Sequence, residues 1–505
     1  MNQDNYDALV IGCGPGGSSA ATFLARAGKR VLVLEKEVFP RFHIGESLLP
    51  CNMAIFREMG VLPALQAAGF PRKLGARFDL CNGTLGVRFP FRQGKYNREP
   101  EAIQVERAVF DHILLKHARA SGADIREGWS VSKFASDADG VSVEACDPDG
   151  KIHHFRASYL IDASGRGNFT GNQEGLRVTH PRHKKLAIFG HFTGVVRDAG
   201  EANSDIIIVR LPNKWFWLIP ISAEKTSVGL VIDKDEFAQE KGAPQEIFDR
   251  WVESSSAVKE RVANAKRVNE TRTTSDFSYY NRRLVGDRLL RVGDAAGFMD
   301  PIFSAGVFLA MWSGKLAAET VQQAIAAGKP GGRRFAVYEK RVKKGLMFYW
   351  RMVENYYTTP FMELFLRPSE RFNLFSAVVG VLAGEVEGSW ALRWRMELFF
   401  LLVKIQARWP FSPRINYRPI VIVTKKDEVE SRVISVLEEM GLEKSSINLD
   451  ARLVTDLRIA SDDLSFTFIP TLEEHFKVNI PNHEWSSCST GRDASNLIKK
   501  YLCKV

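Results

Sequence analysis

Three glycines near the start of the chain are spaced for phosphate binding. Gly12, Gly14 and Gly17 follow the pattern G-x-G-x-x-G, directly after an apolar run at residues 6–11 that is typical of a buried strand. The first glycine permits a tight turn, the second lets the backbone approach a pyrophosphate, and the third lets a helix pack closely on the strand. Glu35 ends a second strand-like run, where its carboxylate can accept hydrogen bonds from ribose hydroxyls. The spacing predicts a βαβ unit that binds a dinucleotide.

Three later segments decide which dinucleotide is expected. Gln104 and Arg107 lie in a Q-V-E-R run, residues 162–165 read D-A-S-G, and L-R-V-G-D at residues 290–294 ends in Asp294. In this order the segments resemble those of the class A flavoprotein monooxygenases. The resemblance implies that FAD is bound, with Gln104 and Arg107 near the flavin and Asp294 hydrogen-bonded to the ribityl chain. No second glycine fingerprint for a nicotinamide domain is visible, so we expect a separate flavin reductase to supply reduced FAD (FADH2).

A pair of tryptophans carries a more specific motif. Trp215 and Trp217 lie in K-W-F-W-L-I-P at residues 214–220, which contains W-x-W-x-I-P. This resembles the signature of the flavin-dependent halogenases. In that family the two indoles lie near the flavin and keep organic substrate away from it, so the resemblance implies a catalytic role for Trp215 and Trp217. A strand with two packing indoles is the structural alternative.

A second segment resembles the halide site of the same family. The run F-M-D-P-I-F-S-A-G at residues 298–306 matches F-x-x-P-x-F-S-x-G. In related halogenases the halide lies against backbone amides at the end of this segment, which implies a halide site at Ser304, Ala305 and Gly306, with Gly306 also at the cofactor. N–H groups at the start of a helix can hold an anion without a formal positive charge. Support of the flavin ring alone is the alternative, as in relatives that do not halogenate.

One lysine completes the halogenase pattern. Hypohalous acid released near the flavin must be held and aimed at a distant carbon, and a lysine can do so as an ammonium that hydrogen-bonds it or as a neutral amine that forms a haloamine. Lys73, in F-P-R-K-L-G-A-R-F at residues 70–78, matches the catalytic-lysine segment of the family. Residues 43–50, H-I-G-E-S-L-L-P, also resemble a segment of this halogenase branch and of its reductase relatives.

The expected substrate is an electron-rich aromatic compound. Phe303 stands where tryptophan halogenases place a glutamate, so the resemblance is closer to the branch that acts on phenols, pyrroles and carrier-protein-tethered acyl groups. The implied reaction uses FADH2, O2 and chloride or bromide. A flavin monooxygenase (hydroxylase) or a reductase of the geranylgeranyl reductase type is the alternative enzyme, and a non-catalytic FAD-bound protein that interacts with carriers is the alternative from another class.

The elements that must position these residues form an α/β fold. We expect an FAD-binding domain of the Rossmann type and a halogenase core at residues 1–330, with a mixed substrate-side sheet inserted at about 73–231. Short alternating runs at residues 141–145 and 206–210 are typical of its strands. Residues 331–420 are rich in aromatic side chains at helical spacing and are expected to cover the active site, although plain core helices would look the same.

The tail, residues 421–505, differs in composition from the rest. It holds 11 Lys+Arg and 14 Asp+Glu, whereas the whole chain has a net charge of +10. Residues 472–476 and 478–481 resemble helix II of an acyl carrier protein and the loop after it. The serine that carries phosphopantetheine should lie in D-S-L, but the chain reads Asp462-Asp463-Leu464, with Ser461 and Ser465 out of register. The resemblance implies a small helical carrier-like domain without its arm, and a plain helical cap is the alternative.

Composition excludes several other classes of protein. A chain of 505 residues with 45% hydrophobic residues can bury a large core. Its six cysteines contain no Cys-x-x-Cys pair, so neither a disulfide framework nor a metal site is expected, and the cytoplasm is the expected compartment. No apolar run of 18 residues indicates a membrane span. The positive charge comes without a nucleic-acid-binding motif and suits an anionic cofactor, substrate or carrier.

Overall fold

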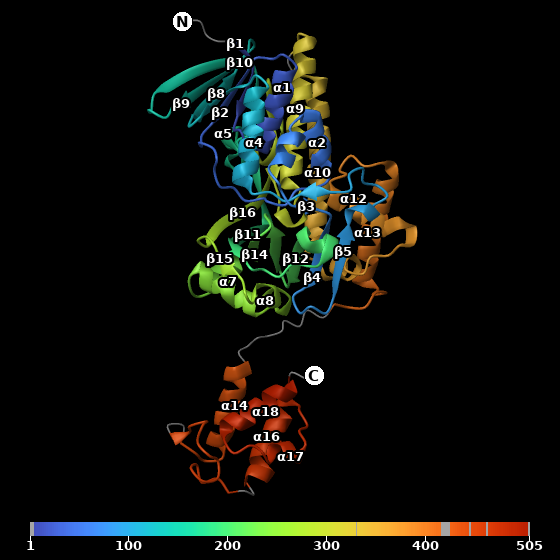
Figure 1. The fold of residues 1–505 in the computed structure, drawn as a ribbon. Coiled ribbons are helices and arrows are strands. Elements are labelled where there is room, and N and C mark those ends of the chain that lie inside the picture. Colours follow the sequence, from blue (N-terminus) through green and yellow to red (C-terminus); the bar gives the residue numbers. More distant parts are fainter. Residues whose placement is uncertain (1–4, 330, 416–424, 444–445, 461–462, 503–505) are drawn as a thin grey trace. The chain divides into compact units, whose positions relative to one another are not determined.

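The computed structural model describes residues 5–329, 331–415, 425–443, 446–460 and 463–502. The chain divides into two compact units, Met1–Tyr417 and Arg418–Val505, which are described separately (Figure 1). Among the described residues, no helix combines the length and the apolar character that crossing a bilayer requires.

The first sheet carries the expected βαβ unit. Strand β1 pairs in parallel with β2, with Ala8 opposite Val31, and the intervening chain forms helix α1 (Pro15–Arg26). Successive side chains of β1 point to opposite faces of the sheet. Ala8 therefore packs with the helices, whereas Leu9 packs against the antiparallel strands β8 and β9. The strands of this sheet are β1 (Asn5–Ile11), β2 (Val31–Glu35), β7 (Asp124–Glu127), β8 (Ser130–Ser136), β9 (Val141–Cys146), β10 (Ile152–Asp162), β17 (Val285–Gly286) and β18 (Leu289–Arg291).

The second sheet lies below the first in Figure 1 and presents two apolar faces. On β13, Trp215 and Trp217 belong to the core shared with the first sheet, whereas Phe216 belongs to a separate core under α7 and α8. In chain order, the strands of this second sheet are β4 (Gly75–Leu80), β5 (Gly86–Pro90), β11 (Arg177–Thr193), β12 (Ile206–Leu211), β13 (Lys214–Pro220), β14 (Lys225–Asp233), β15 (Lys266–Arg267), β16 (Arg272–Asn281) and β19 (Gly297–Phe298). A separate ladder joins β3 (Arg72–Lys73) to β6 (Ala102–Ile103).

The second sheet does not occupy the continuous range of about residues 73–231 that the sequence predicts for the substrate-side sheet. Strands β7 to β10 fall inside that range but belong to the first sheet, and β15, β16 and β19 follow it in sequence but complete the second sheet. The chain therefore passes between the two sheets more than once. A continuous range could not represent this, because strand order in a sheet is set by pairing and not by sequence position.

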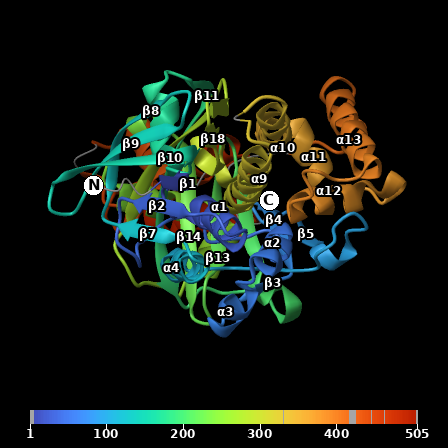
Figure 2. The ribbon, with the colours of Figure 1, turned by 90° about the horizontal axis from the view of Figure 1, so that it is seen from above.

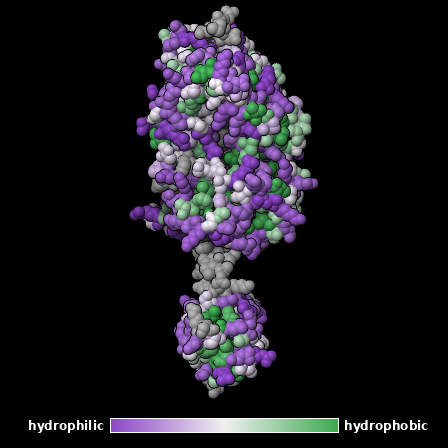
Figure 3. Space-filling model, turned by 90° about the vertical axis from the view of Figure 1, so that its left-hand side faces the viewer, coloured by the Kyte–Doolittle hydropathy of each residue, from purple (hydrophilic) through white to green (hydrophobic). Residues whose placement is uncertain are grey.

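Helices cover the sheets and fill the side opposite β8 and β9, where Figure 2 shows α10 to α13 together. In the first unit the helices are α1, α2 (Cys51–Met59), α3 (Leu62–Ala67), α4 (Arg107–Ala120), α5 (Phe169–Gln173), α6 (Lys234–Gln239), α7 (Pro244–Glu253), α8 (Ser256–Val262), α9 (Gly306–Ala326), α10 (Arg333–Tyr356), α11 (Thr359–Phe365), α12 (Leu374–Ala383) and α13 (Trp390–Arg408). On the face drawn in Figure 3, hydrophobic residues are interspersed among hydrophilic ones.

The second unit is a small helical body with its own apolar core. Its helices include α14 (Lys425–Glu439), α16 (Ile469–Phe476), α17 (Asn482–Trp485) and α18 (Gly491–Leu502), and Val433, Leu472 and Ile498 are among the core residues. Ser461 and Asp462 of the carrier-like motif lie outside the described residues. Asp463 is exposed at the start of a π-turn (Leu464–Phe468), so the carrier resemblance of this unit stays a prediction.

Candidate functional site

The glycine turn has the geometry that a pyrophosphate requires. Gly12 has a φ of +91°, and a Cβ there would lie 2.6 Å from the carbonyl oxygen of Ala163. A Cβ on Gly17 would overlap the carbonyl oxygen of Gly12. At Gly14 the nearest atom to a Cβ would be Nη2 of Arg41 at 3.7 Å, which leaves the second glycine open. Two glycines are therefore required by the protein backbone, and the third leaves room beside the start of α1 for a phosphate.

Glu35 binds the same turn directly. Its Oε2 accepts a hydrogen bond of 2.6 Å from the backbone N–H of Cys13, and its Oε1 accepts one of 2.9 Å from the N–H of Glu37. The carboxylate is buried, and each oxygen keeps a second lone pair that can accept from a ribose hydroxyl. The sequence motif gave the ribose role but missed this structural one.

Gln104 and Arg107 lie beside the segment at residues 43–50. Gln104 donates from Nε2 to the carbonyl of Ser204 at 3.1 Å, while its buried Oε1 has no hydrogen-bond partner among the described residues. Arg107 makes a bidentate pair with Asp111 at 2.7 and 2.8 Å and donates to the carbonyl of Ile44 at 2.7 Å. Gln104 therefore offers an acceptor for a ligand, whereas Arg107 chiefly fixes the loop.

A small hollow brings the second cofactor segment and the halide segment together. Its lining includes Asp294, Ala305 and Gly306, and helix α10 contributes Tyr349 and Val353. Removal from water raises the pKa of Asp294 to about 6.

The halide segment turns sharply just before α9. Ser304 adopts the left-handed conformation with φ +56°, Ala305 caps α9, and Gly306 is its first residue. A Cβ on Gly306 would meet no atom within 4 Å, so the helix start faces open space. Ser304 is not among the residues that line the hollow. The left-handed conformation of Ser304 instead orients the backbone amides of Ala305 and Gly306.

A hydrogen-bond chain links the first signature tryptophan to this turn. Trp215 donates from Nε1 to the hydroxyl of Tyr357 at 3.0 Å, and that hydroxyl donates to Oδ2 of Asp300 at 2.6 Å. Asp300 in turn accepts from the N–H of Ile302 at 3.2 Å. Tyr357 follows α10 directly and belongs to no motif, so sequence reasoning missed it. These hydrogen bonds tie the indole of Trp215 to the halide segment.

The second signature tryptophan is held by packing. Trp217 donates from Nε1 to the hydroxyl of Ser227 at 3.1 Å, and its ring lies 5.8 Å from that of Trp215. A Cβ on Gly229, its partner on β14, would overlap this ring. Both indoles are almost fully buried, but neither lines the hollow. Both lie in the apolar core that also contains Phe303 and Ala305 of the halide segment.

Lys73 lies in a separate buried environment and is 1% exposed. Its Nζ donates to the hydroxyl of Ser47 and to the carbonyl of Leu48, both at 2.9 Å, and lies 5.5 Å from the ring centre of Phe91. Burial lowers the pKa of Lys73 to about 7, although the nearby Asp205 carboxylate acts in the opposite direction. Within the described part of the chain Lys73 has no direct ion pair, and such a buried lysine is poised to act as an amine near neutral pH. It does not line the hollow.

A buried pair joins the segment at residues 43–50 to strand β11. Oε1 of Glu46, next to Ser47, lies 2.7 Å from Nε2 of His191, and Oε2 of Glu46 is buried with no hydrogen-bond partner among the described residues. On the same strand as His191, Phe189 contacts Trp217 at 5.8 Å between ring centres. His191 was missed because it lies 145 residues from Glu46 in sequence.

Comparisons with known proteins agree with this geometry. The family model described as FAD binding domain matches residues 5–339. The chain is 31% identical over 379 residues to the 1H-pyrrole-2-carbonyl-[peptidyl-carrier protein] chlorinase of Pseudomonas fluorescens, covering 71% of this chain and 84% of the chlorinase. It is 33% identical over 351 residues to the tryptophan 2-halogenase of Chondromyces crocatus, covering 68% of this chain and 66% of that protein.

The solved structure of the flavin-dependent brominase Bmp2 has the same fold. It superposes with a TM-score of 0.71 at 30% identity and covers 80% of this chain and 99% of the brominase. The match to FAD-binding proteins covers more than half of the chain, and halogenases match it over most of their own length. The chain is therefore an FAD-binding enzyme that belongs to the flavin-dependent halogenases.

Proposed function

We propose that this enzyme halogenates an electron-rich aromatic ring, a pyrrole or a phenol that is free or tethered to a carrier protein, and that Lys73 delivers the halogen. The co-substrates are FADH2 from a separate flavin reductase, O2, and chloride or bromide. A relative that acts on a pyrrole bound to a carrier protein supports the substrate class. The observation that carries the proposal is the buried Lys73, whose pKa of about 7 suits an amine that takes up halogen.

The residues present fit FAD. The open backbone at Gly14, the carboxylate of Glu35 and the buried acceptor of Gln104 offer partners for a pyrophosphate, a ribose and a flavin ring respectively. Asp294, in the wall of the hollow, offers a carboxyl group to the ribityl hydroxyls. Bound in reduced form, the flavin supplies the electrons that activate O2.

The chain's own groups handle the halide and exclude the substrate. The amides of Ala305 and Gly306, at the open start of α9, can hold chloride or bromide in the hollow. Trp215 and Trp217 lie in the apolar core that also contains Phe303 and Ala305. An organic ring then reacts away from the flavin, and only a small species has to travel to Lys73.

At Lys73 the atoms balance in either protonation state. The neutral amine and hypohalous acid give a haloamine and water, with the N–H proton leaving in the water. The ammonium form instead donates a hydrogen bond to the oxygen of hypohalous acid. In both cases the ring carbon forms a bond to the halogen and then loses its proton to a base. Two contacts of 2.9 Å fix Nζ in place for this step.

The proposal is tested by product analysis. The purified full-length chain is supplied with a flavin reductase, NADH, FAD and either chloride or bromide, together with phenols, tryptophan and a pyrrolyl-carrier protein. We expect mass spectra with a halogen isotope pattern for at least one phenol or pyrrole. Tryptophan is included because Phe303 argues against it whereas one relative is named for it. Hydroxylated product without halogen would instead support the monooxygenase alternative.

For the second unit we propose a carrier-like domain that cannot bear an arm. In the carrier resemblance the position of the phosphopantetheine serine falls on Asp463, which is exposed, and a carboxylate cannot be phosphopantetheinylated. Asp463→Ser should therefore permit arm attachment, seen as a mass gain after incubation with a phosphopantetheinyl transferase and coenzyme A. The unmodified chain is the control. Absence of a mass gain from the substituted chain would count against this register.

A further inference from the structure

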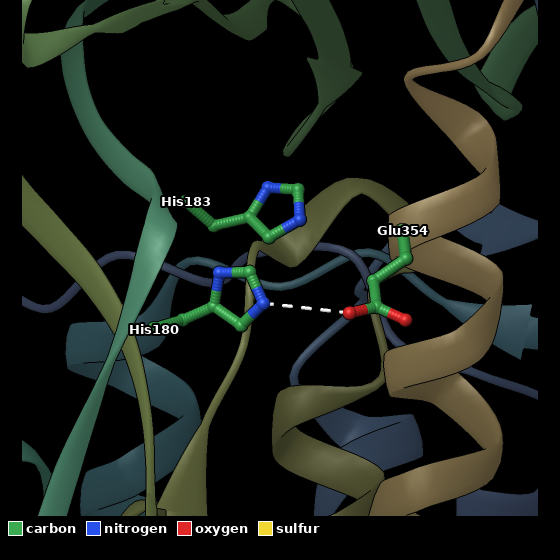
Figure 4. Close-up of side chains that lie close together, drawn as sticks. All are labelled: His180, His183 and Glu354. Carbon is green, nitrogen blue, oxygen red and sulfur yellow. Dashed lines mark ion pairs between the residues drawn. The ribbon is translucent and has the colours of Figure 1, made fainter.

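Two imidazoles and a carboxylate that belong to none of the sequence motifs meet on the first unit. His180 and His183 come from β11, at the point where its pairing with β16 shifts register between Thr179 and Lys184. Glu354 comes from the last turn of α10. Figure 4 shows both rings turned toward the space in front of the carboxylate. Among the described residues, no other group of three or more His, Cys, Asp or Glu side chains is arranged to hold a metal ion.

We propose that His180, His183 and Glu354 form a zinc site that fastens strand β11 to helix α10. One ligand atom from each residue lies within 4.8 Å of the other two. The pair His180 Nε2 and Glu354 Oε1 is 3.4 Å apart, which is close to the separation of about 3.4 Å between two ligands of a tetrahedral zinc ion with bonds of about 2.0–2.1 Å. Small side-chain rotations would bring the third ligand to the same distance.

The surroundings hold the two rings in place. His180 and His183 lie 4.4 Å apart between ring centres, and they pack against Trp350 at 5.3 Å and Tyr357 at 5.6 Å respectively. The side chain of His180 is only 11% exposed, whereas that of Glu354 is 42% exposed. An ion can therefore enter from the side of the carboxylate, and water can take the fourth position.

The ligand types select the ion. Imidazole nitrogen suits zinc and its neighbours among the divalent transition metals, whereas calcium and magnesium prefer oxygen ligands. Two cations close in sequence to the ligands are already paired, Lys185 with Asp233 at 2.9 Å and Arg351 with Glu397 at 2.6 Å. The site is therefore expected to bind zinc and to ignore magnesium.

Zinc here would act on the halide pocket through the helix. Val353, the neighbour of Glu354 in sequence, lines the hollow together with Tyr349. Tyr357, the partner of Trp215, packs against His183. An ion that joins β11 to α10 would fix the end of the helix that supplies these side chains. The site thus has a structural role in positioning one wall of the halide pocket.

Direct binding tests the proposal on the full-length chain. The protein is treated with EDTA, freed of chelator and titrated with zinc chloride in a calorimeter. Cobalt serves as a spectroscopic probe, because its visible absorption reports the coordination geometry. We expect one equivalent of either metal to bind, and cobalt to show a four- or five-coordinate spectrum. Absence of equimolar binding, or binding of magnesium at the same place, would overturn the proposal.

Single substitutions identify the ligands. Because loss of an outer-shell partner alone typically costs 10–100-fold in affinity, loss of a ligand should raise the Kd for zinc by at least about tenfold. We expect this for His180→Ala and for Glu354→Gln, which keeps the shape of a half-exposed side chain and should not disturb folding. His154→Ala, at an exposed position on β10, is the matched control. Equal zinc affinity in Glu354→Gln and in the unsubstituted chain would overturn the proposal, as would an equal loss in the control.

Discussion

The buried amine of Lys73 should make the stability of the enzyme depend on pH in a defined way. Its pKa falls from 10.5 to about 7 on folding. Between these two values the unfolded chain binds more protons than the folded one, so the stability contributed at this position rises with pH across that window. At about 1.36 kcal/mol per pH unit the full change is about 5 kcal/mol. The side chain is 1% exposed, so solvent screening reduces this figure little.

The assay compares the unsubstituted enzyme with Lys73→Met, which keeps the apolar stem and removes the amine. Loss of the hydrogen bonds to Ser47 and Leu48 adds a cost that does not vary with pH, and only the pH-dependent difference is used. An unfolding entropy of about 2.1 cal/mol/K per residue gives about 0.9 kcal/mol/K for a unit of this size, so about 5 kcal/mol corresponds to about 6 °C in Tm. Because pH 10 still lies below 10.5, about 4 kcal/mol of this change falls between pH 6 and pH 10. Relative to Lys73→Met, the Tm of the unsubstituted enzyme should therefore rise by about 4 °C over that interval.

The exposed Lys340 provides a control, because the side chain replaced in Lys340→Met stays in water in both states. A Tm difference between Lys73→Met and the unsubstituted enzyme that stays constant from pH 6 to pH 10 would show that folding does not lower the pKa of Lys73. It would mean that the lysine is charged in the folded enzyme, and the amine route to a haloamine would then be lost.

Three further substitutions probe the rest of the site. Tyr357→Phe removes the acceptor of Trp215 and a donor to Asp300, so it should cost about 1–3 kcal/mol in unfolding free energy. It should also lower the halogenation rate about tenfold or more while the FAD content is unchanged. A normal rate would show that the hydrogen bonds from Trp215 to Asp300 are not needed. Gly17→Ala places a methyl group on a backbone oxygen of the glycine turn and should yield protein without FAD, as seen by absorbance; bound FAD would contradict the turn geometry. Gly306→Ala points a methyl group into open space and should keep FAD but raise the KM for halide, whereas an unchanged KM would remove the halide from this turn.

Local features of the fold could be predicted from the sequence because neighbouring residues determine them. The βαβ unit follows from the glycine spacing and the two apolar runs, and the structure confirms it in the parallel pairing of β1 and β2. The two tryptophans share a face of β13 because they are two residues apart on a strand. The predicted extent of the second sheet was wrong, because pairing between strands that are distant in sequence leaves no local signal in the sequence.

The contacts that organise the site lie beyond the reach of motif reasoning. Tyr357 is 142 residues from Trp215, and His191 is 145 residues from Glu46. Each is an ordinary aromatic or polar residue in its own segment, and only folding brings the partners together. The segment around Lys73 predicts a role for that lysine but not its lowered pKa, because burial depends on the packing of the surrounding chain.

A single-turnover reaction of Lys73→Ala shows directly whether Lys73 carries the halogen to the substrate. The reduced, FAD-loaded variant is mixed with O2, bromide and an accepted aromatic substrate, and both flavin oxidation and brominated product are followed. We expect the flavin to be oxidised at an unchanged rate while halogenated product falls to the background level without enzyme. Halogenated product at the level of the unsubstituted enzyme would contradict it.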